Sequence, residues 1–195
     1  CTDSIRVGAL PEKCEYRAFE HFLPAGLSVY ATYSDGREEE VALSALTFAY
    51  PDGATSFHVR SPYLLISYCG ADVTLPLTVR AADYPMSGIS FPDRTFVYDG
   101  VFHTIDPVGT LPTGEDGSRL SASVTGGGTD AGNYTLTLTF RSGSEDYLTP
   151  PPMTASLTLL PKETEILFGN TSFVYNGETR CPDAWYIDVF GKKIK

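Results

Sequence analysis

The sequence has few positive charges and no long apolar stretch. Of its 195 residues, 14 are Lys or Arg and 24 are Asp or Glu, which gives a formal net charge of −10 and a pI of about 4.6. Nucleic-acid binding depends on clustered Lys and Arg that neutralise phosphates, so this balance argues against nucleic acid and against an anionic membrane surface. No apolar run is long enough to span a bilayer, so we expect no membrane insertion.

Cysteine is also scarce. The four cysteines, Cys1, Cys14, Cys69 and Cys181, show no C-x-x-C spacing, and the three histidines are scattered, so the sequence contains no zinc-site pattern. We expect one disulfide or none. Free thiols are the default interpretation, and a Cys1–Cys69 bridge is the alternative, because immunoglobulin topology would bring those two residues to the same end of the first module.

Catalytic motifs are missing as well. The sequence has no G-x-S-x-G elbow, no H-E-x-x-H helix and no phosphate-binding glycine loop, and residues 126–128 (GGG) precede no helical pattern. His58 alternates with apolar neighbours and is expected on a strand surface. Glu115, Asp116 and Asp130 could bind calcium if loops brought them together, but ordinary acidic turns are the simpler interpretation. We therefore predict no catalytic, cofactor-binding or metal-binding residues.

What the chain does contain is typical of β structure. It has 18 Gly, 14 Pro, 12 Tyr and 11 Phe, and its segments alternate between apolar and polar residues. The clearest strand is predicted at residues 27–33, and the turn residues 34–36 follow it. Further strands are predicted at 37–43, 63–68 and 73–79, the last with a break or bulge at Pro76 because proline cannot donate to a ladder.

A repeat organises the second half of the chain. Residues 95–100 (TFVYDG) return 77 residues later as residues 172–177 (SFVYNG), and two upstream apolar residues match at the same offset. A fixed self-similarity indicates a repeated structural unit. Four positions mark the predicted strand and turn that open each unit: Tyr98, Gly100, Tyr175 and Gly177.

The repeat divides the chain into three parts. We predict one module at residues 1–82, a second at 83–162, and at 163–195 the truncated start of a further repeat. The connection at residues 80–85 is short and lacks a Gly/Ser run, which favours a stiff joint. Residues 163–195 lack the later strands of the repeat, so we expect this tail to fray or to pair with the edge of the preceding module.

The second module carries a tyrosine-corner pattern. Asp130, Gly132 and Tyr134 form a D-x-G-x-Y run before an alternating strand, an arrangement in which the tyrosine hydroxyl bonds to upstream backbone at the entry to a sandwich strand. Leu136 stands where a disulfide cysteine would be, so apolar packing must join the sheets. The predicted fold class is therefore all-β, with tandem immunoglobulin-like β-sandwich modules joined by short linkers.

Parts of the chain resemble two known families. Residues 13–79 resemble the third group of bacterial immunoglobulin-like domains, through Tyr16, the run GLSVYATYSDG at residues 26–36, and LPLTV at residues 75–79. The second module resembles the MBG/YDG repeats of bacterial surface adhesins, and residues 163–195 look like the start of another such repeat. The matching residues in the second module are Phe91 and the ranges 96–100, 109–114 and 131–134.

The resemblance implies spacer modules of a large, repetitive, secreted or wall-attached bacterial protein. We expect a non-catalytic, monomeric structural module that supports adhesion outside the cell, with any glycan or host protein bound through the parent protein. One alternative is a direct carbohydrate- or host-binding adhesin module that uses exposed aromatics such as Tyr30, Trp185 and Tyr186. A second is an accessory domain of a polysaccharide-degrading enzyme.

Overall fold

The chain is all-β. A computed structural model describes residues 2–195, of which about 45% lie in strands, arranged in several small sheets. The described residues contain no α-helix, and three short 3₁₀ turns occur at Leu43–Ala45, Pro51–Gly53 and Met86–Gly88. This confirms the all-β prediction at the level of fold class.

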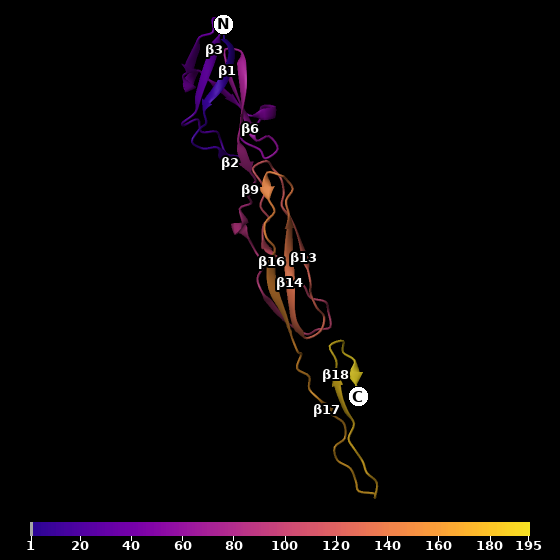
Figure 1. Cartoon of the computed structure of the whole chain (residues 1–195). Coiled ribbons are helices and arrows are strands. Elements are labelled where there is room, and N and C mark those ends of the chain that lie inside the picture. The colour runs from indigo at the N-terminus through magenta and orange to yellow at the C-terminus, as the bar shows by residue number, and fades with distance from the viewer. Residues whose placement is uncertain (1) are drawn as a thin grey trace. The chain divides into compact units, whose positions relative to one another are not determined.

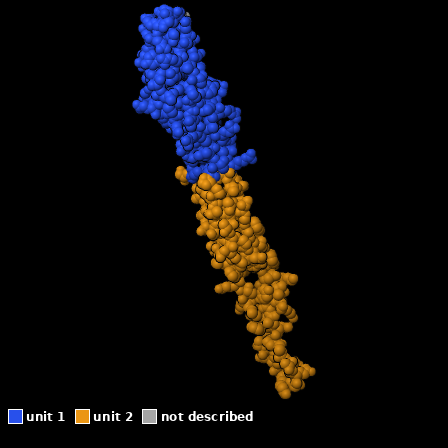
Figure 2. Space-filling model, in the orientation of Figure 1, with its two compact units in different colours: residues 1–86, 111–121, 141–150 blue, residues 87–110, 122–140, 151–195 orange. Residues whose placement is uncertain are grey.

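The described residues form two compact units (Figure 2). Unit 1 contains the residues up to Met86 together with Leu111–Ser121 and Arg141–Pro150. Unit 2 contains Ser87–Thr110, Ala122–Phe140 and Pro151–Lys195. Two loops of the predicted second module therefore pack with the first module.

Unit 1 contains two three-stranded antiparallel sheets and two short parallel pairs (Figure 1). The sheets have the orders β1-β3-β4 and β5-β6-β7, and the pairs are β2-β8 and β9-β15. Alternation decides which side of each strand is buried, since successive side chains point to opposite faces. The bounds are β1 Thr2–Ala9, β2 Glu15–Arg17, β3 Ser28–Tyr33, β4 Glu38–Val41, β5 Thr47–Ala49, β6 Tyr63–Tyr68, β7 Ala71–Pro76, β8 Thr78–Arg80, β9 Ala82–Asp83 and β15 Tyr147–Leu148.

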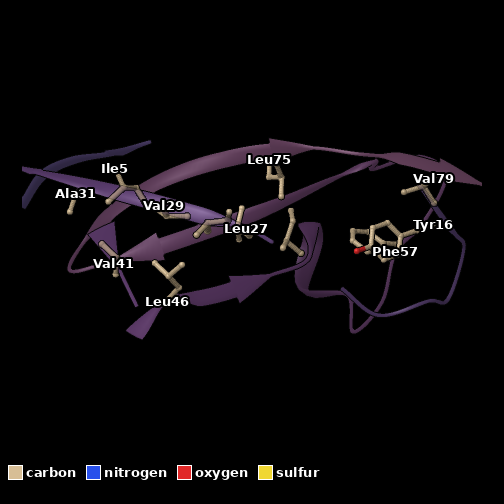
Figure 3. Packing of buried hydrophobic residues seen from close by; sticks show 12 residues of the cluster. Ile5, Tyr16, Leu27, Val29, Ala31, Val41, Leu46, Phe57, Leu75 and Val79 are labelled. Atoms are coloured by element: carbon tan, nitrogen blue, oxygen red, sulfur yellow. The ribbon is translucent and has the colours of Figure 1, made fainter. Parts of the chain in front are cut away.

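One apolar core joins the two sheets of unit 1 (Figure 3). Val29 and Ala31 of β3 are fully buried, as the alternation predicts, and they share the core with Leu64 and Ile66 of β6. Val29, Leu64 and Ile66 each contribute about 1.5–3 kcal/mol through their removal from water. The predicted strand at 73–79 is interrupted between β7 and β8, directly after Pro76.

The main sheet of unit 2 has the order β11-β16-β14-β13. β16 lies between β11, which is parallel to it, and β14, which is antiparallel. Leu136, Leu138 and Leu157 are completely buried, so apolar packing on one face stabilises this sheet without a disulfide. The bounds are β10 Ile89–Ser90, β11 Arg94–Val97, β12 Val108–Gly109, β13 Ser121–Thr125, β14 Gly132–Arg141 and β16 Met153–Leu160; β10 and β12 form a separate antiparallel pair.

Residues 163–195 form a small antiparallel sheet of their own. Its order is β17-β18-β19, with bounds Leu167–Phe168, Ala184–Ile187 and Lys193–Ile194. The sequence predicts that this tail either frays or pairs with the edge of the preceding module. It does not pair with that edge; instead, β18 pairs with β17 on one side and with β19 on the other. No residue after Leu160 is buried, so this segment has no core.

Candidate functional site

Asp146 joins its own loop to two other segments of unit 1, through its carboxylate and its backbone carbonyl. Asp146 accepts a hydrogen bond from His58 Nδ1 at 2.8 Å and another from the Val59 N–H at 2.7 Å. Its backbone carbonyl accepts the Ala82 N–H at 2.8 Å. The side chain of Asp146 is only 15% exposed, so these charge-assisted bonds lie largely away from water.

The loop that carries Asp146 is itself ordered by serine side chains. Ser142 Oγ donates to the carbonyl of Ser144 at 2.7 Å and accepts the Ser144 N–H at 3.2 Å. Ser144 Oγ in turn accepts the Asp146 N–H at 3.2 Å. These local bonds hold the loop backbone in one conformation, and that conformation directs the Asp146 side chain toward His58.

Next to Asp146, the ring of Tyr147 stacks with two other aromatic rings of unit 1. Tyr147 lies between Phe19 and Tyr84, with ring centroids 5.1 Å and 4.2 Å away. The Tyr147 hydroxyl accepts the Glu115 N–H at 2.7 Å, and burial raises the pKa of Tyr147 above its usual value. Phe19 has a φ of 71°, a left-handed conformation that is uncommon for a bulky residue. The stack and the Asp146 bonds together explain why residues 111–121 and 141–150 belong to unit 1.

A polar cavity lies beside His58. Its volume is about 560 Å³, and its walls include Asp52, Ser56, His58, Arg60, Ser144 and Glu145. Arg60 and Glu145 form an exposed ion pair at 3.3 Å on its wall. Its size suits a small molecule, but small-molecule sites are normally lined mainly by apolar and aromatic groups, and here Pro51 and Ala54 are the apolar side chains among a mostly polar lining.

The described residues around the cavity hold no cluster of metal-binding side chains. Within residues 2–195, no group of three or more His, Cys, Asp or Glu side chains could hold a metal ion. Of the calcium candidates, Asp116 accepts the Ser118 N–H at 2.9 Å, as in an ordinary acidic turn. Sequence reasoning placed His58 on a strand surface and missed its bond to Asp146, because the two residues are 88 positions apart.

The predicted tyrosine corner has the expected hydrogen bond. The hydroxyl of Tyr134 donates to the backbone carbonyl of Asp130 at 2.8 Å, and Gly132 is the first residue of β14. The Tyr134 ring is half-buried and packs on Gly128, where a Cβ atom would approach Cζ of the ring to 2.2 Å. Gly128 is therefore required by packing, whereas the sequence indicated only a flexible hairpin.

The two predicted opening turns are also formed. Gly100 and Gly177 have φ angles of 80° and 83°, which a residue with a side chain rarely adopts. Tyr98 donates its backbone N–H to the carbonyl of Leu160 at 2.8 Å and is half-buried, whereas Tyr175 is 91% exposed. The tyrosine of this strand-and-turn motif is therefore half-buried in the first copy and exposed in the second.

Of the three aromatic residues considered for sugar binding, Tyr30 and Trp185 are partly covered by cations, while Tyr186 is 38% exposed. The Arg6 guanidinium lies 4.8 Å from the centroid of the Tyr30 ring, and Lys193 Nζ lies 3.5 Å from that of Trp185. Each cation occupies one ring face, which a sugar would otherwise stack on.

The cysteines form no disulfide among the described residues. The Cys14 thiol donates to the Pro11 carbonyl at 3.1 Å, and Cys69 and Cys181 are exposed. Cys1 lies outside the described residues, so the Cys1–Cys69 bridge stays a prediction.

No protein-family model and no curated protein matches this chain. Among residues 2–195, no helix has the length and apolar character needed to cross a membrane.

Proposed function

We propose that the chain is a non-catalytic spacer from a bacterial surface or secreted protein, built of tandem immunoglobulin-like β-sandwich modules. The observation that carries this proposal is the contact around Asp146 and Tyr147, by which the loop at residues 141–150 of the second module is held against His58 and Phe19 of the first. A spacer needs joints that resist bending, and a flexible linker would lack such contacts. The surface location rests on the family resemblance described above.

The joint combines several modest interactions. Each aromatic pair contributes about 0.5–1.5 kcal/mol beyond its buried area, and each hydrogen bond adds about 0.5–1.5 kcal/mol. Three segments of the first module take part, at Phe19, His58 and Ala82, so bending would break bonds at several points at once. The many cross-strand pairs of the two sheets in unit 1 support the first module from within.

A binding role is the second candidate, and the cavity beside His58 is the observation that favours it. A polar ligand could contact Arg60 and Ser56 there. Direct sugar stacking is less favoured, since cations already cover one face of Tyr30 and of Trp185.

The spacer proposal is tested by measuring a distance distribution within unit 1. Two fluorophores are introduced at the exposed residues Thr74 and Arg119 as noncanonical amino acids, because four native cysteines would confuse thiol labelling. We expect a single narrow distribution that broadens in Asp146→Ala. A broad distribution in the unaltered chain would contradict a stiff joint.

The binding alternative is tested separately on a glycan array and by titration with simple sugars. The Arg60→Ala variant is the matched control, because it alters the cavity wall at an exposed ion pair. Saturable binding that Arg60→Ala weakens would favour the binding role over the spacer role.

A further inference from the structure

The cavity beside His58 is formed by two stretches of unit 1, within residues 51–61 and at residues 143–146. Its volume of about 560 Å³ is in the range of small-molecule sites, although its lining is mostly polar. A polar group that has lost water and gained no partner favours a ligand that pairs with it. The polar groups on the walls that lack a partner therefore indicate which ligand the cavity can hold.

Ser56 is the most deeply buried of these groups. It is 9% exposed, and its hydroxyl makes no hydrogen bond with any residue from 2 to 195. Within those residues, every fully enclosed side-chain nitrogen or oxygen has a partner, so the Ser56 hydroxyl keeps contact with open space. Ser56 lines the cavity, and the cavity is therefore the space that this hydroxyl faces.

His58 supplies a hydrogen-bond acceptor on the same wall. An ionised carboxylate can only accept, so Nδ1 of His58 carries the proton of the 2.8 Å bond to Asp146. In the neutral imidazole Nε2 is then unprotonated and acts as an acceptor. A ligand that contacts this nitrogen has to bring a donor of its own.

The charges around the cavity favour a positive ligand. Arg60 is already paired with Glu145 at 3.3 Å, and the carboxylate of Asp146 is occupied by the bonds described above. The carboxylate of Asp52 remains, because it has neither an ion pair nor a hydrogen bond within residues 2–195. The chain also has a formal net charge of −10, which attracts cations and repels anions.

A metal ion is not the cation that this site favours. No group of three or more His, Cys, Asp or Glu side chains in the described part of the chain could hold one. An organic cation needs fewer charged partners, because an ammonium group has three donors that neutral acceptors can also satisfy.

We propose that this cavity binds a small organic cation that carries a protonated amine and hydroxyl groups, which is the chemistry of an amino sugar. The ammonium group pairs with the free carboxylate of Asp52 and with Nε2 of His58. A hydroxyl group of the ligand pairs with the hydroxyl of Ser56. The proposal names the ligand class for the binding role given above as the second candidate, and it rests on that role.

The test compares three sugars that share one ring and differ in charge: glucosamine, which is positive at neutral pH, glucose, which is neutral, and glucuronate, which is negative. Each is titrated into the 195-residue chain, and backbone amide NMR shifts of residues 51–61 and 143–146 report binding. We expect glucosamine to bind with a dissociation constant of roughly 1 mM, glucose to bind about five- to tenfold more weakly, and glucuronate not to bind measurably.

Two variants separate the charge from the hydroxyl contact. Asp52→Asn should weaken glucosamine binding about five- to tenfold and leave glucose binding unchanged, because it removes a charge and keeps the shape. Asp52 has a φ of 56°, which Asn also tolerates, so this variant should fold. Ser56→Ala should weaken the binding of both sugars about three- to tenfold, because both lose a hydrogen-bond partner.

Glu40→Gln is the matched control for charge. Glu40 is an exposed residue of β4, so its substitution makes the same change in net charge as Asp52→Asn at a different place in unit 1. We expect it to leave the binding of both sugars unchanged. If it weakened glucosamine binding as much as Asp52→Asn does, the preference would come from the net charge of the chain, and the proposal would be overturned.

The affinities of the unaltered chain can also contradict the proposal. Equal affinity for glucosamine and glucose, or tighter binding of glucuronate, would overturn the ligand class and leave the binding role in place. Absence of a saturable shift with glucosamine would overturn it as well, while the glycan array decides the binding role separately. None of these results changes the expected distance distribution between Thr74 and Arg119, so the spacer proposal is judged independently.

Discussion

Residues 89–100 and 166–177 have closely related sequences but different environments. Both contain an aromatic strand motif and a glycine turn, and in both the turn is formed. Ile89 and Phe91 of the first segment are 8% and 9% exposed, whereas Ile166 and Phe168 of the second are 60% and 59% exposed. In the first segment β11 also pairs with β16, although its Phe96 and Val97 stay exposed. Local sequence therefore determines the turn, while burial depends on strands that come later in the chain.

The largest expected effect uses a matched pair of phenylalanines. Phe91→Ala should lower the free energy of unfolding of unit 2 by about 3–5 kcal/mol, because it empties a buried site. Phe168→Ala should change it by less than about 0.5 kcal/mol, because its ring is mostly exposed. Chemical denaturation of both variants measures the difference, and equal losses would break the comparison.

The next prediction concerns the loop at residues 141–150, which lies in the first copy of the repeat. Residues 141–150 contact the first module through Asp146. Asp146→Ala leaves the Val59 N–H and His58 without their acceptor, so we expect a loss of about 1–3 kcal/mol in the stability of unit 1.

Its neighbour provides the control. Glu145 forms only an exposed ion pair with Arg60, so Glu145→Ala should cost about 0–1 kcal/mol. Thermal unfolding of the two variants distinguishes them. If Glu145→Ala cost as much as Asp146→Ala, the joint would depend on net charge rather than on the specific bonds.

A smaller effect is expected at the tyrosine corner. Tyr134→Phe removes one hydrogen bond to Asp130 and should cost about 1 kcal/mol. Tyr175→Phe is the control for loss of a hydroxyl at a tyrosine whose side chain is 91% exposed, and it should be neutral. Urea denaturation measures both, and a neutral Tyr134→Phe would show that the corner does not stabilise β14.

The smallest predicted effect is a pH dependence in alkaline solution. Burial raises the pKa of Tyr147, so the folded state favours the neutral phenol more than the unfolded state does. The resulting stability is fully present below the unfolded pKa of about 10 and is lost as the pH rises through the folded pKa. Tyr147→Phe should reduce this loss, and an unchanged alkaline dependence in that variant would contradict the assignment.

Sequence reasoning worked where the information is local. The strand over residues 27–33, the break at Pro76 and the positive-φ turns at Gly100 and Gly177 follow from alternation and turn chemistry. These features depend on neighbours a few positions away.

It did not find the contacts that join distant segments. The bond between His58 and Asp146 spans 88 positions, and neither residue carries a pattern that names its partner. The packing of Gly128 on the Tyr134 ring was likewise missed, because a glycine run reads as a flexible hairpin until the ring is placed against it. Single residues in distant loops give no periodic signal, so a structure is needed to pair them.

The most direct test of the account is native-state hydrogen exchange of the two motif copies in the same chain. The central claim is that later strands, and not the motif itself, provide the protection. We predict that backbone amides in residues 94–98 exchange about a hundredfold or more slowly than those in residues 171–175. Equal protection of the two segments would contradict the claim.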